Sequence, residues 1–220
     1  MKKLVSMASR TGRQFQRYNQ GCRQVVGSIP CRLRKTKNQS PSTHGTLIEE
    51  IEVLLISSQK SPRMMFPKGG WEIDESMEGA VSRETQEEAG VLGYVGCRLG
   101  TWSFKSKSQG TFHEGHMFAF FVTDELDVWP EKNVRQRLWM TVKEAREACV
   151  HLWMKEALDV LVDRLMHLQR KDEEIRTPCL LEYLTEEGRT GIVSQTGEDE
   201  GACFTILDCQ FQATTTRSCL

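Results

Sequence analysis

The sequence predicts an α/β protein in which a β-sheet is sandwiched between α-helices. Several apolar runs of strand length are rich in Val, Ile and Phe, and turn residues separate them. Two longer segments instead carry apolar residues at helical spacing. Because strands and amphipathic helices must each bury an apolar face, such an alternation favours helices packed on a sheet.

At 220 residues, the chain is expected to form one domain of about 150 residues with flanking segments. We expect residues 1–19 to be a basic, irregular N-terminal segment and residues 20–168 to be the folded domain. Residues 169–220 are rich in charge, Gly and Thr, and we predict a C-terminal tail that is mostly disordered. No apolar run reaches the roughly 18 residues of a transmembrane helix, so no membrane association is expected.

Composition limits the compartment and the partners. The eight cysteines are scattered without a C-x2-C pair, which favours reduced thiols inside the cell over a zinc site or a disulfide scaffold. The N-terminus lacks a secretory apolar run but contains no Asp or Glu before Glu49 and is Arg-rich, so cytosol and mitochondrion are equally supported. Net charge is −1, and aromatic residues do not alternate with the basic ones. We therefore do not expect a nucleic-acid partner.

The first half of the domain reads as strands. Cys22–Leu33 is apolar and β-branched at its centre, with Pro30 indicating an edge or an exit from the sheet. Thr46–Ser57 is the strongest strand pattern. Met64–Phe66 is predicted to be a short strand, and Pro67–Gly70 a turn by its composition.

The second half begins with a helix over about residues 76–89. Asp74 or Ser76 can cap its start, and Gly90 is a typical residue to end it. The remaining predicted elements are strands over 94–105, 116–123 and 137–141, a short helix over 142–149 and a long helix over 152–168.

The helix over 76–89 carries Glu84, Glu87 and Glu88 at i, i+3 and i+4. These spacings place three carboxylates on one face, where like charges repel each other. A divalent cation would compensate, and carboxylate oxygens are hard ligands that suit Mg²⁺ or Mn²⁺. The sequence therefore predicts a magnesium or manganese site on this helix.

The stretch Gly69–Val91 resembles the signature of the Nudix hydrolase family, G-x5-E-x7-R-E-U-x-E-E-x-G-U, where U is a bulky apolar residue. One position departs from the signature, because the first U is Thr85. The resemblance implies the Nudix fold, a mixed sheet between helices, and metal-dependent attack of water on a pyrophosphate bond. The matching residues are Gly69, Glu75, Arg83, Glu84, Glu87, Glu88, Gly90 and Val91.

The resemblance also implies roles for the acidic residues, which are the catalytic candidates. Glu84 and Glu88 correspond to the principal metal ligands, and Glu87 to a third ligand or to the general base. The main-chain carbonyl of Gly69 is a candidate extra ligand, since a glycine turn permits close backbone approach.

Other motif positions are expected to be structural. Glu75 and Arg83 are expected to pair and hold the loop against the helix, and Gly90 to end the helix. Thr85 faces the core, so its hydroxyl needs a partner, for which a carbonyl one turn back is the expected choice.

The flanks Glu52–Ser58 and Phe66–Glu72 resemble the diphosphoinositol polyphosphate phosphohydrolase branch, and more closely plant Nudix hydrolases of that type. The resemblance implies a phosphorylated small molecule as substrate, either a diphosphoinositol polyphosphate or a diadenosine polyphosphate. Several cations are needed for such anions, and Arg forms a bidentate fork with phosphate. The candidate substrate-binding residues are Arg13, Arg17, Arg23, Lys68, Gly69 and Gly70.

Two alternatives remain open. The signature by itself does not separate these substrates from ADP-ribose, NADH, nucleotide sugars or capped RNA. A phosphate-ligand sensor or interaction module with little catalysis is an alternative of another class, although the carboxylate set is intact.

Overall fold

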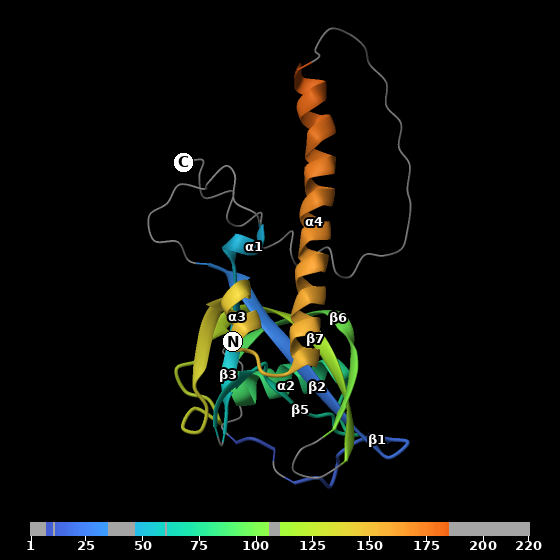
Figure 1. Ribbon diagram of the computed structural model, residues 1–220, viewed down its shortest axis with the longest axis vertical. Coiled ribbons are helices and arrows are strands. Elements are labelled where there is room, and N and C mark those ends of the chain that lie inside the picture. Colours follow the sequence, from blue (N-terminus) through green and yellow to red (C-terminus); the bar gives the residue numbers. More distant parts are fainter. Residues whose placement is uncertain (1–7, 11, 35–46, 60, 106–110, 185–220) are drawn as a thin grey trace. The chain divides into compact units, whose positions relative to one another are not determined.

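One mixed β-sheet organises the chain (Figure 1). The computed structural model describes residues 8–10, 12–34, 47–59, 61–105 and 111–184, with side chains to residue 170 except Leu47. The strands are β1 Tyr18–Asn19, β2 Cys22–Leu33, β3 Ile51–Ser58, β4 Ser61–Met65, β5 Lys68–Gly70, β6 Val91–Lys105, β7 Phe112–Glu125 and β8 Arg137–Thr141. Their order is β4-β3-β2-β7-β6, with β1 and β5 paired to β2 and β8 paired to β3. Only β2 and β7 run parallel among the described strands, so the sheet is mixed.

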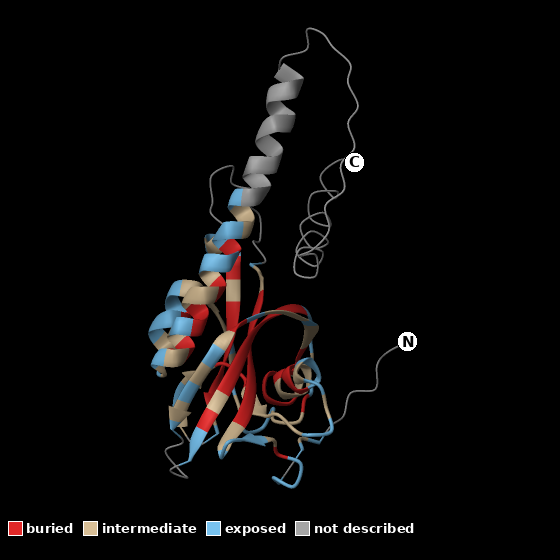
Figure 2. Ribbon diagram, turned by 90° about the vertical axis from the view of Figure 1, so that its right-hand side faces the viewer, coloured by how far each residue is buried: buried red, intermediate tan, exposed pale blue. Residues whose placement is uncertain are grey.

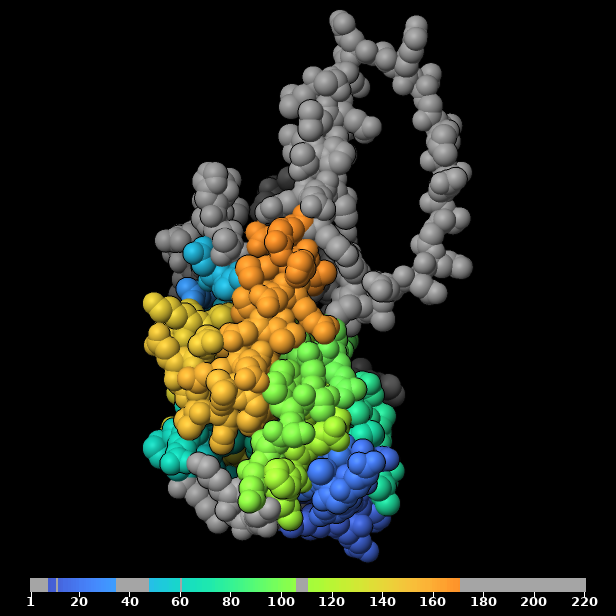
Figure 3. Space-filling model, turned by 45° about the vertical axis from the view of Figure 1, so that its right-hand side comes forward, coloured from blue at the N-terminus to red at the C-terminus, as the bar shows by residue number. Residues whose placement is uncertain are grey.

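The helices are α1 Leu47–Glu50, α2 Met77–Ala89, α3 Val142–Ala148 and α4 Leu152–Leu184. Figure 2 shows α2 on one face of the sheet and the first part of α4 on the other. In Figure 3 this part of α4 (orange) lies against β6 (green), where Trp102 Nε1 donates to Glu156 Oε2 at 2.9 Å. The predicted α/β sandwich is therefore confirmed.

Strand β7 is buried on both faces, from Gly115 to Val122, as expected for a strand covered by helices on either side. On the face below α2, one apolar cluster joins helix and sheet. Its buried members are Val26, Leu54, Ile56, Ala80, Val81, Ala89, Val91, Phe118, Phe120 and Val122. This cluster fixes the side of α2 opposite its carboxylates.

Both ends of α2 are satisfied as the sequence predicts. Ser76 is the N-cap, and its hydroxyl accepts from the Gly79 N–H at 3.0 Å. Gly90 is the C-cap in the left-handed conformation, with φ of 64°. Arg137 donates to the carbonyls of Ala89 and Gly90 at 3.1 and 2.8 Å, and the Gly90 carbonyl also accepts from the Leu126 N–H at 2.8 Å, so these carbonyls at the helix end have partners.

Several boundaries differ from the predictions. The strand predicted from Thr46 begins at Ile51, where pairing with Leu33 of β2 starts, and residues 47–50 form α1 instead. The Lys68–Gly70 part of the predicted turn is strand β5, because its backbone pairs with Val25–Gly27. The strands β6 and β7 are also longer than predicted, since they pair with each other from Val91–Glu125 to Lys105–Phe112.

The chain divides into two compact units, residues 1–167 and 168–220. Helix α4 continues to Leu184, so the described residues of the second unit are helical where the sequence predicts a tail. Leu, Glu, Lys and Arg are good helix formers even where the apolar spacing is lost. The rest of the predicted disordered tail, 185–220, lies outside the described residues, as do residues 1–7 of the N-terminal segment. In the described part of the chain, no helix combines the length and apolar character needed to cross a membrane.

Thr85, the departure from the motif, is 1% exposed on the core side of α2. Its hydroxyl donates to the Val81 carbonyl at 2.6 Å, the partner expected one turn back. It also lies 2.6 Å from Ser28 Oγ of β2. Since the Thr85 proton is already used, Ser28 must donate to Thr85. The polar side chain is thus paired within the core.

We expect Thr85→Val to lower the free energy of unfolding by about 1–3 kcal/mol, because it leaves the fully buried Ser28 hydroxyl without an acceptor. The double variant Ser28→Ala/Thr85→Val should recover most of that loss. Urea denaturation of the single and double variants measures this coupling, and simple additivity of the two single costs would contradict it.

Candidate active site

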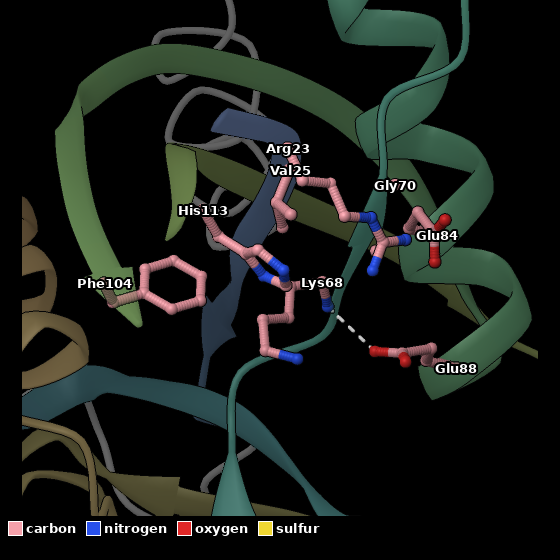
Figure 4. A pocket seen from close by; sticks show the side chains of 9 residues that line it. Arg23, Val25, Lys68, Gly70, Glu84, Glu88, Phe104 and His113 are labelled. Atoms are coloured by element: carbon pink, nitrogen blue, oxygen red, sulfur yellow. Dashed lines mark hydrogen bonds between the residues drawn. The ribbon is translucent and has the colours of Figure 1, made fainter. Parts of the chain in front are cut away.

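The acidic face of α2 meets β5 at a cavity of about 270 Å³ (Figure 4). Its lining comes from five elements: β2, β5, α2, β6 and β7. The lining residues are Arg23, Val25, Lys68, Gly69, Gly70, Glu84, Glu88, Phe104 and His113. The cavity therefore combines two carboxylates, two cations, two ring side chains and a glycine strand.

Arg83 holds the glycine strand against the helix. Its Nε and Nη2 donate to the two oxygens of Glu75 at 3.0 and 2.7 Å, and Nη2 also donates to the Gly70 carbonyl at 2.9 Å. Side-chain exposure is 15% for Arg83 and 11% for Glu75, so this fork is shielded from water. The predicted pairing of Glu75 with Arg83 is confirmed.

Gly69 leaves room for the carboxylate of Glu84. A Cβ placed on Gly69 would lie 1.9 Å from Glu84 Cδ, far inside contact distance. Burial raises the pKa of Glu84, while the Arg83 guanidinium, 2.8 Å away, opposes that shift. Only glycine at position 69 permits this close approach of strand and carboxylate.

Glu87 and Glu88 are also buried, at 6% exposure each. Burial raises the pKa of both to about 7, and the charge of Glu84 adds to the shift. Glu88 accepts from the Lys68 N–H at 2.8 Å, whereas Glu87 accepts from the Arg10 N–H at 3.3 Å. Glu87 does not line the cavity. Burial and the charge of Glu84 therefore disfavour the ionised forms of Glu87 and Glu88.

Arg135 reaches the acidic face of α2 from the segment before β8. Its side chain is 9% exposed and pairs with Glu88. It also donates to Glu131 Oε2 at 2.5 Å and to the Ser57 carbonyl at 3.0 Å. A buried cation thus partly neutralises Glu88.

The donor set fits a hard divalent ion. Three carboxylates and the backbone of β5 offer only oxygen ligands, which Mg²⁺ and Mn²⁺ prefer. In the described residues, however, no three His, Cys, Asp or Glu side chains are arranged to hold a metal as they stand. The physical reason is that each carboxylate is turned toward its own N–H or cationic partner. The buried carboxylates would suit a metal once they reorient, and the missing side chain at Gly69 leaves space for Glu84 beside β5.

The predicted substrate-binding residues separate into two groups. Arg23, Lys68, Gly69 and Gly70 line the cavity, but Arg13 and Arg17 do not. The Arg17 guanidinium instead lies 4.1 Å from the ring centre of Trp71. Arg13 is exposed. Burial of Arg23 lowers the pKa of that residue, and the positive charge of Arg13 lowers it further.

Phe104 and His113 form a ring-bearing wall that the sequence analysis does not identify as part of a site. Their ring centres lie 5.5 Å apart in an edge-to-face arrangement, and Phe104 stacks on Trp153 at 4.7 Å. The register explains their meeting, since His113 is the cross-strand partner of both Arg23 and Phe104. These two residues can be assigned to the site only when the strand register is known, and the local sequence pattern does not determine that register.

Comparison with known proteins identifies the family. A family model described as NUDIX domain matches residues 42–161. Arabidopsis thaliana "Nudix hydrolase 17, mitochondrial" is 58% identical over 177 residues, covering 80% of this chain and 94% of that protein. "Nudix hydrolase 18, mitochondrial", also from Arabidopsis thaliana, is 60% identical over 182 residues, covering 82% and 100%.

More distant similarities agree with this result. Mouse (Mus musculus) "Diphosphoinositol polyphosphate phosphohydrolase 3-alpha" is 38% identical over 99 residues, covering 44% of this chain and 58% of that protein. The NUDIX domain of Shewanella oneidensis NrtR, solved with ADP ribose, shares the fold with a TM-score of 0.50 and 15% identity, covering 67% and 90%. Together with the Gly69–Val91 signature and its buried carboxylates, these matches show that the chain belongs to the Nudix hydrolase family and is a hydrolase of pyrophosphate bonds.

Proposed function

We propose that this hydrolase requires Mg²⁺ or Mn²⁺ and cleaves diphosphoinositol polyphosphates or diadenosine polyphosphates. One observation carries the proposal: Arg23 and Lys68 line the same cavity as Glu84 and Glu88. Cations that bind phosphate and carboxylates that bind metal thus face one space. The name of the mouse relative supports the inositol substrate.

In this proposal Glu84, Glu88 and the Gly69 carbonyl hold the metal at the wall formed by α2 and β5. A bound divalent ion would neutralise the diphosphate and lower the pKa of an attacking water. Glu87 completes the acidic face, either as a third ligand or as the base that accepts the proton of that water. Glu75 and Arg83 act by keeping β5 and α2 in register.

Arg23 and Lys68 bind and orient the phosphates. Arg23 is partly buried and presents a planar fork, which suits two phosphate oxygens. Lys68 adds a mobile charge close to Glu88, whose carboxylate its backbone N–H already contacts. The cavity of about 270 Å³ is smaller than the roughly 300–1,000 Å³ of pockets that enclose whole drug-sized ligands. It suits the reacting diphosphate, with the rest of the substrate outside.

A second candidate is hydrolysis of ADP-ribose, NADH or a nucleotide sugar. The wall of Phe104 and His113 is compatible with it, because a nucleobase can stack on such rings, but the wall would serve the adenines of a diadenosine polyphosphate equally well. A sensor with little catalysis is opposed by the complete carboxylate set.

The deciding experiment measures kcat/KM for a diphosphoinositol polyphosphate, a diadenosine polyphosphate and ADP-ribose, each with Mg²⁺, Mn²⁺ or EDTA. We expect at least about tenfold preference for one of the first two, because the extra phosphates add charge-assisted contacts. EDTA should abolish turnover. A preference for ADP-ribose would overturn the substrate assignment, and full turnover in EDTA would overturn the metal assignment.

The compartment is proposed as the mitochondrion rather than the cytosol. The two Arabidopsis relatives are named mitochondrial, and the N-terminal segment here lacks acidic residues. Imaging of the full chain fused at its C-terminus to a fluorescent protein tests this, and a uniform cytosolic signal would contradict it.

A further inference from the structure

Gln16 is a buried polar side chain outside the residues matched by the family model, 9% exposed. Its Nε2 lies within hydrogen-bond distance of three backbone carbonyls, those of Arg17, Gln24 and Trp71, at 3.1, 2.9 and 3.0 Å, which share its two hydrogens. Its Oε1 accepts from Arg23 Nε at 2.7 Å. The residue therefore links the N-terminal segment, β2 and the motif loop after β5.

The orientation of this amide is determined by its partners. Three carbonyl oxygens can only accept hydrogen bonds, so the NH₂ group must face them. The Oε1 atom then has to face Arg23, whose Nε can only donate. A flipped amide would place its oxygen against three carbonyls and its NH₂ against an arginine. Gln16 thus presents a fixed acceptor to Arg23.

The contact with Gln16 uses only the Nε of Arg23 and leaves its two η nitrogens for other partners. Figure 4 shows the Arg23 guanidinium reaching toward Gly70 and Glu84. A Cβ on Gly70 would lie 2.1 Å from Gln16 Oε1 and 2.9 Å from Arg23 Nη2, so the glycine strand, the amide and the guanidinium are closely packed. Among the described residues, the Arg23 guanidinium makes no ion pair, and its Nε donates to Gln16. Both of its η nitrogens can therefore serve an anion.

We propose that Gln16 is a positioning residue for substrate binding: it holds Arg23 by its Nε so that the η nitrogens form a bidentate fork for a substrate phosphate. This rests on the proposed function of Arg23. An arginine anchored at one edge loses less conformational entropy when phosphate binds. The N-terminal segment, through Gln16, then contributes to affinity without touching the substrate.

Gln16→Met tests the role, because methionine has a similar volume and offers no strong hydrogen bond. The variant should fold, since each of the three carbonyls keeps a backbone partner. The Trp71 carbonyl still accepts from the Arg17 N–H, the Arg17 carbonyl from Gln24 and the Gln24 carbonyl from Trp71. Gln14→Met is the matched control, because Gln14 is exposed two residues earlier in the same segment.

The probe is inorganic pyrophosphate with Mg²⁺, titrated by calorimetry into the full chain. We expect Arg23→Met to weaken binding about tenfold or more, as for loss of a charged hydrogen-bond pair. Gln16→Met should weaken it roughly 3- to 10-fold, and Gln14→Met should not change it. In the double variant Gln16→Met/Arg23→Met, the Kd should equal that of Arg23→Met, because Gln16 acts through Arg23.

The outcomes separate the two assignments. Unchanged binding in Arg23→Met, or no binding by the wild type, would overturn the phosphate role of Arg23 and with it that of Gln16. Weaker binding in Arg23→Met but not in Gln16→Met would overturn only the role of Gln16. The same conclusion would follow if both single variants weakened binding equally and the double variant showed the product of the two fold-changes in Kd. In the wild type, NMR should show slow solvent exchange of the Arg23 Nε proton, and exchange as fast as in free arginine would also contradict the contact.

Discussion

Glu88→Gln is expected to reduce kcat by at least about 100-fold with Mg²⁺. Changing a residue that merely orients a metal ligand costs about 10–100-fold in affinity or activity, so loss of a proposed ligand should cost at least the upper value. The amide keeps the shape of the side chain but not its charge. Steady-state kinetics over a Mg²⁺ titration measures the effect. Glu78→Gln, on the exposed side of the same helix, is the control and should retain full activity.

The same substitution should stabilise the metal-free protein at high pH. The folded-state pKa of Glu88 is about 7, above the usual range of a carboxyl, so ionisation opposes folding once the pH exceeds about 4.5. The penalty grows up to about pH 7 and stays constant above it, on the order of 1–3 kcal/mol. In EDTA, Glu88→Gln should therefore melt above wild type at pH 8 and close to it at pH 4.5. A lower melting temperature than wild type at pH 8 would refute this.

Gly69→Ala is expected to lower kcat/KM by about 100-fold while leaving stability nearly unchanged. The new Cβ would fall 1.9 Å from Glu84 Cδ. Because the atoms it meets are the flexible end of a side chain, Glu84 can turn away at little energetic cost. Moving a catalytic group by about 1 Å lowers the reaction rate by about 100-fold. Activity assays combined with thermal melts distinguish this local effect from unfolding.

Gly79→Ala is the matched control within the same motif. Gly79 lies in the first turn of α2, and its added Cβ meets only Ser76 Oγ at 3.1 Å. Alanine is favoured over glycine in a helix by up to about 1 kcal/mol. The variant should thus be as active as wild type and slightly more stable. An activity loss equal to that of Gly69→Ala would show that the motif rejects any added methyl group.

Features that depend on neighbours in sequence were predicted well. Helical spacing places Glu84, Glu87 and Glu88 together, and turn chemistry ends α2 at Gly90. The hydroxyl contact of Thr85 follows from a spacing of one helical turn, and the pairing of Glu75 with Arg83 was implied by the family motif. Such features need only the local backbone conformation, which the motif itself specifies.

The remaining parts of the site depend on contacts between distant strands. Arg23, Lys68, Phe104 and His113 meet because β2 pairs with β5 and β7, and β7 pairs with β6, in one particular register. A shift of one residue would turn each side chain to the other face. Arg13 and Arg17 were as basic as Arg23, yet neither lines the cavity, and no local pattern distinguished them.

The sequence of this hydrolase thus determined its chemistry, since the carboxylates and their helix lie within one continuous segment. The tertiary structure decided the surroundings of that segment: which cations reach the carboxylates, which rings face them, and that Gln16 holds Arg23. The physical reason is that strand register and loop packing depend on how much apolar surface the whole core buries. That total involves residues from many segments, so it cannot be read from any single one.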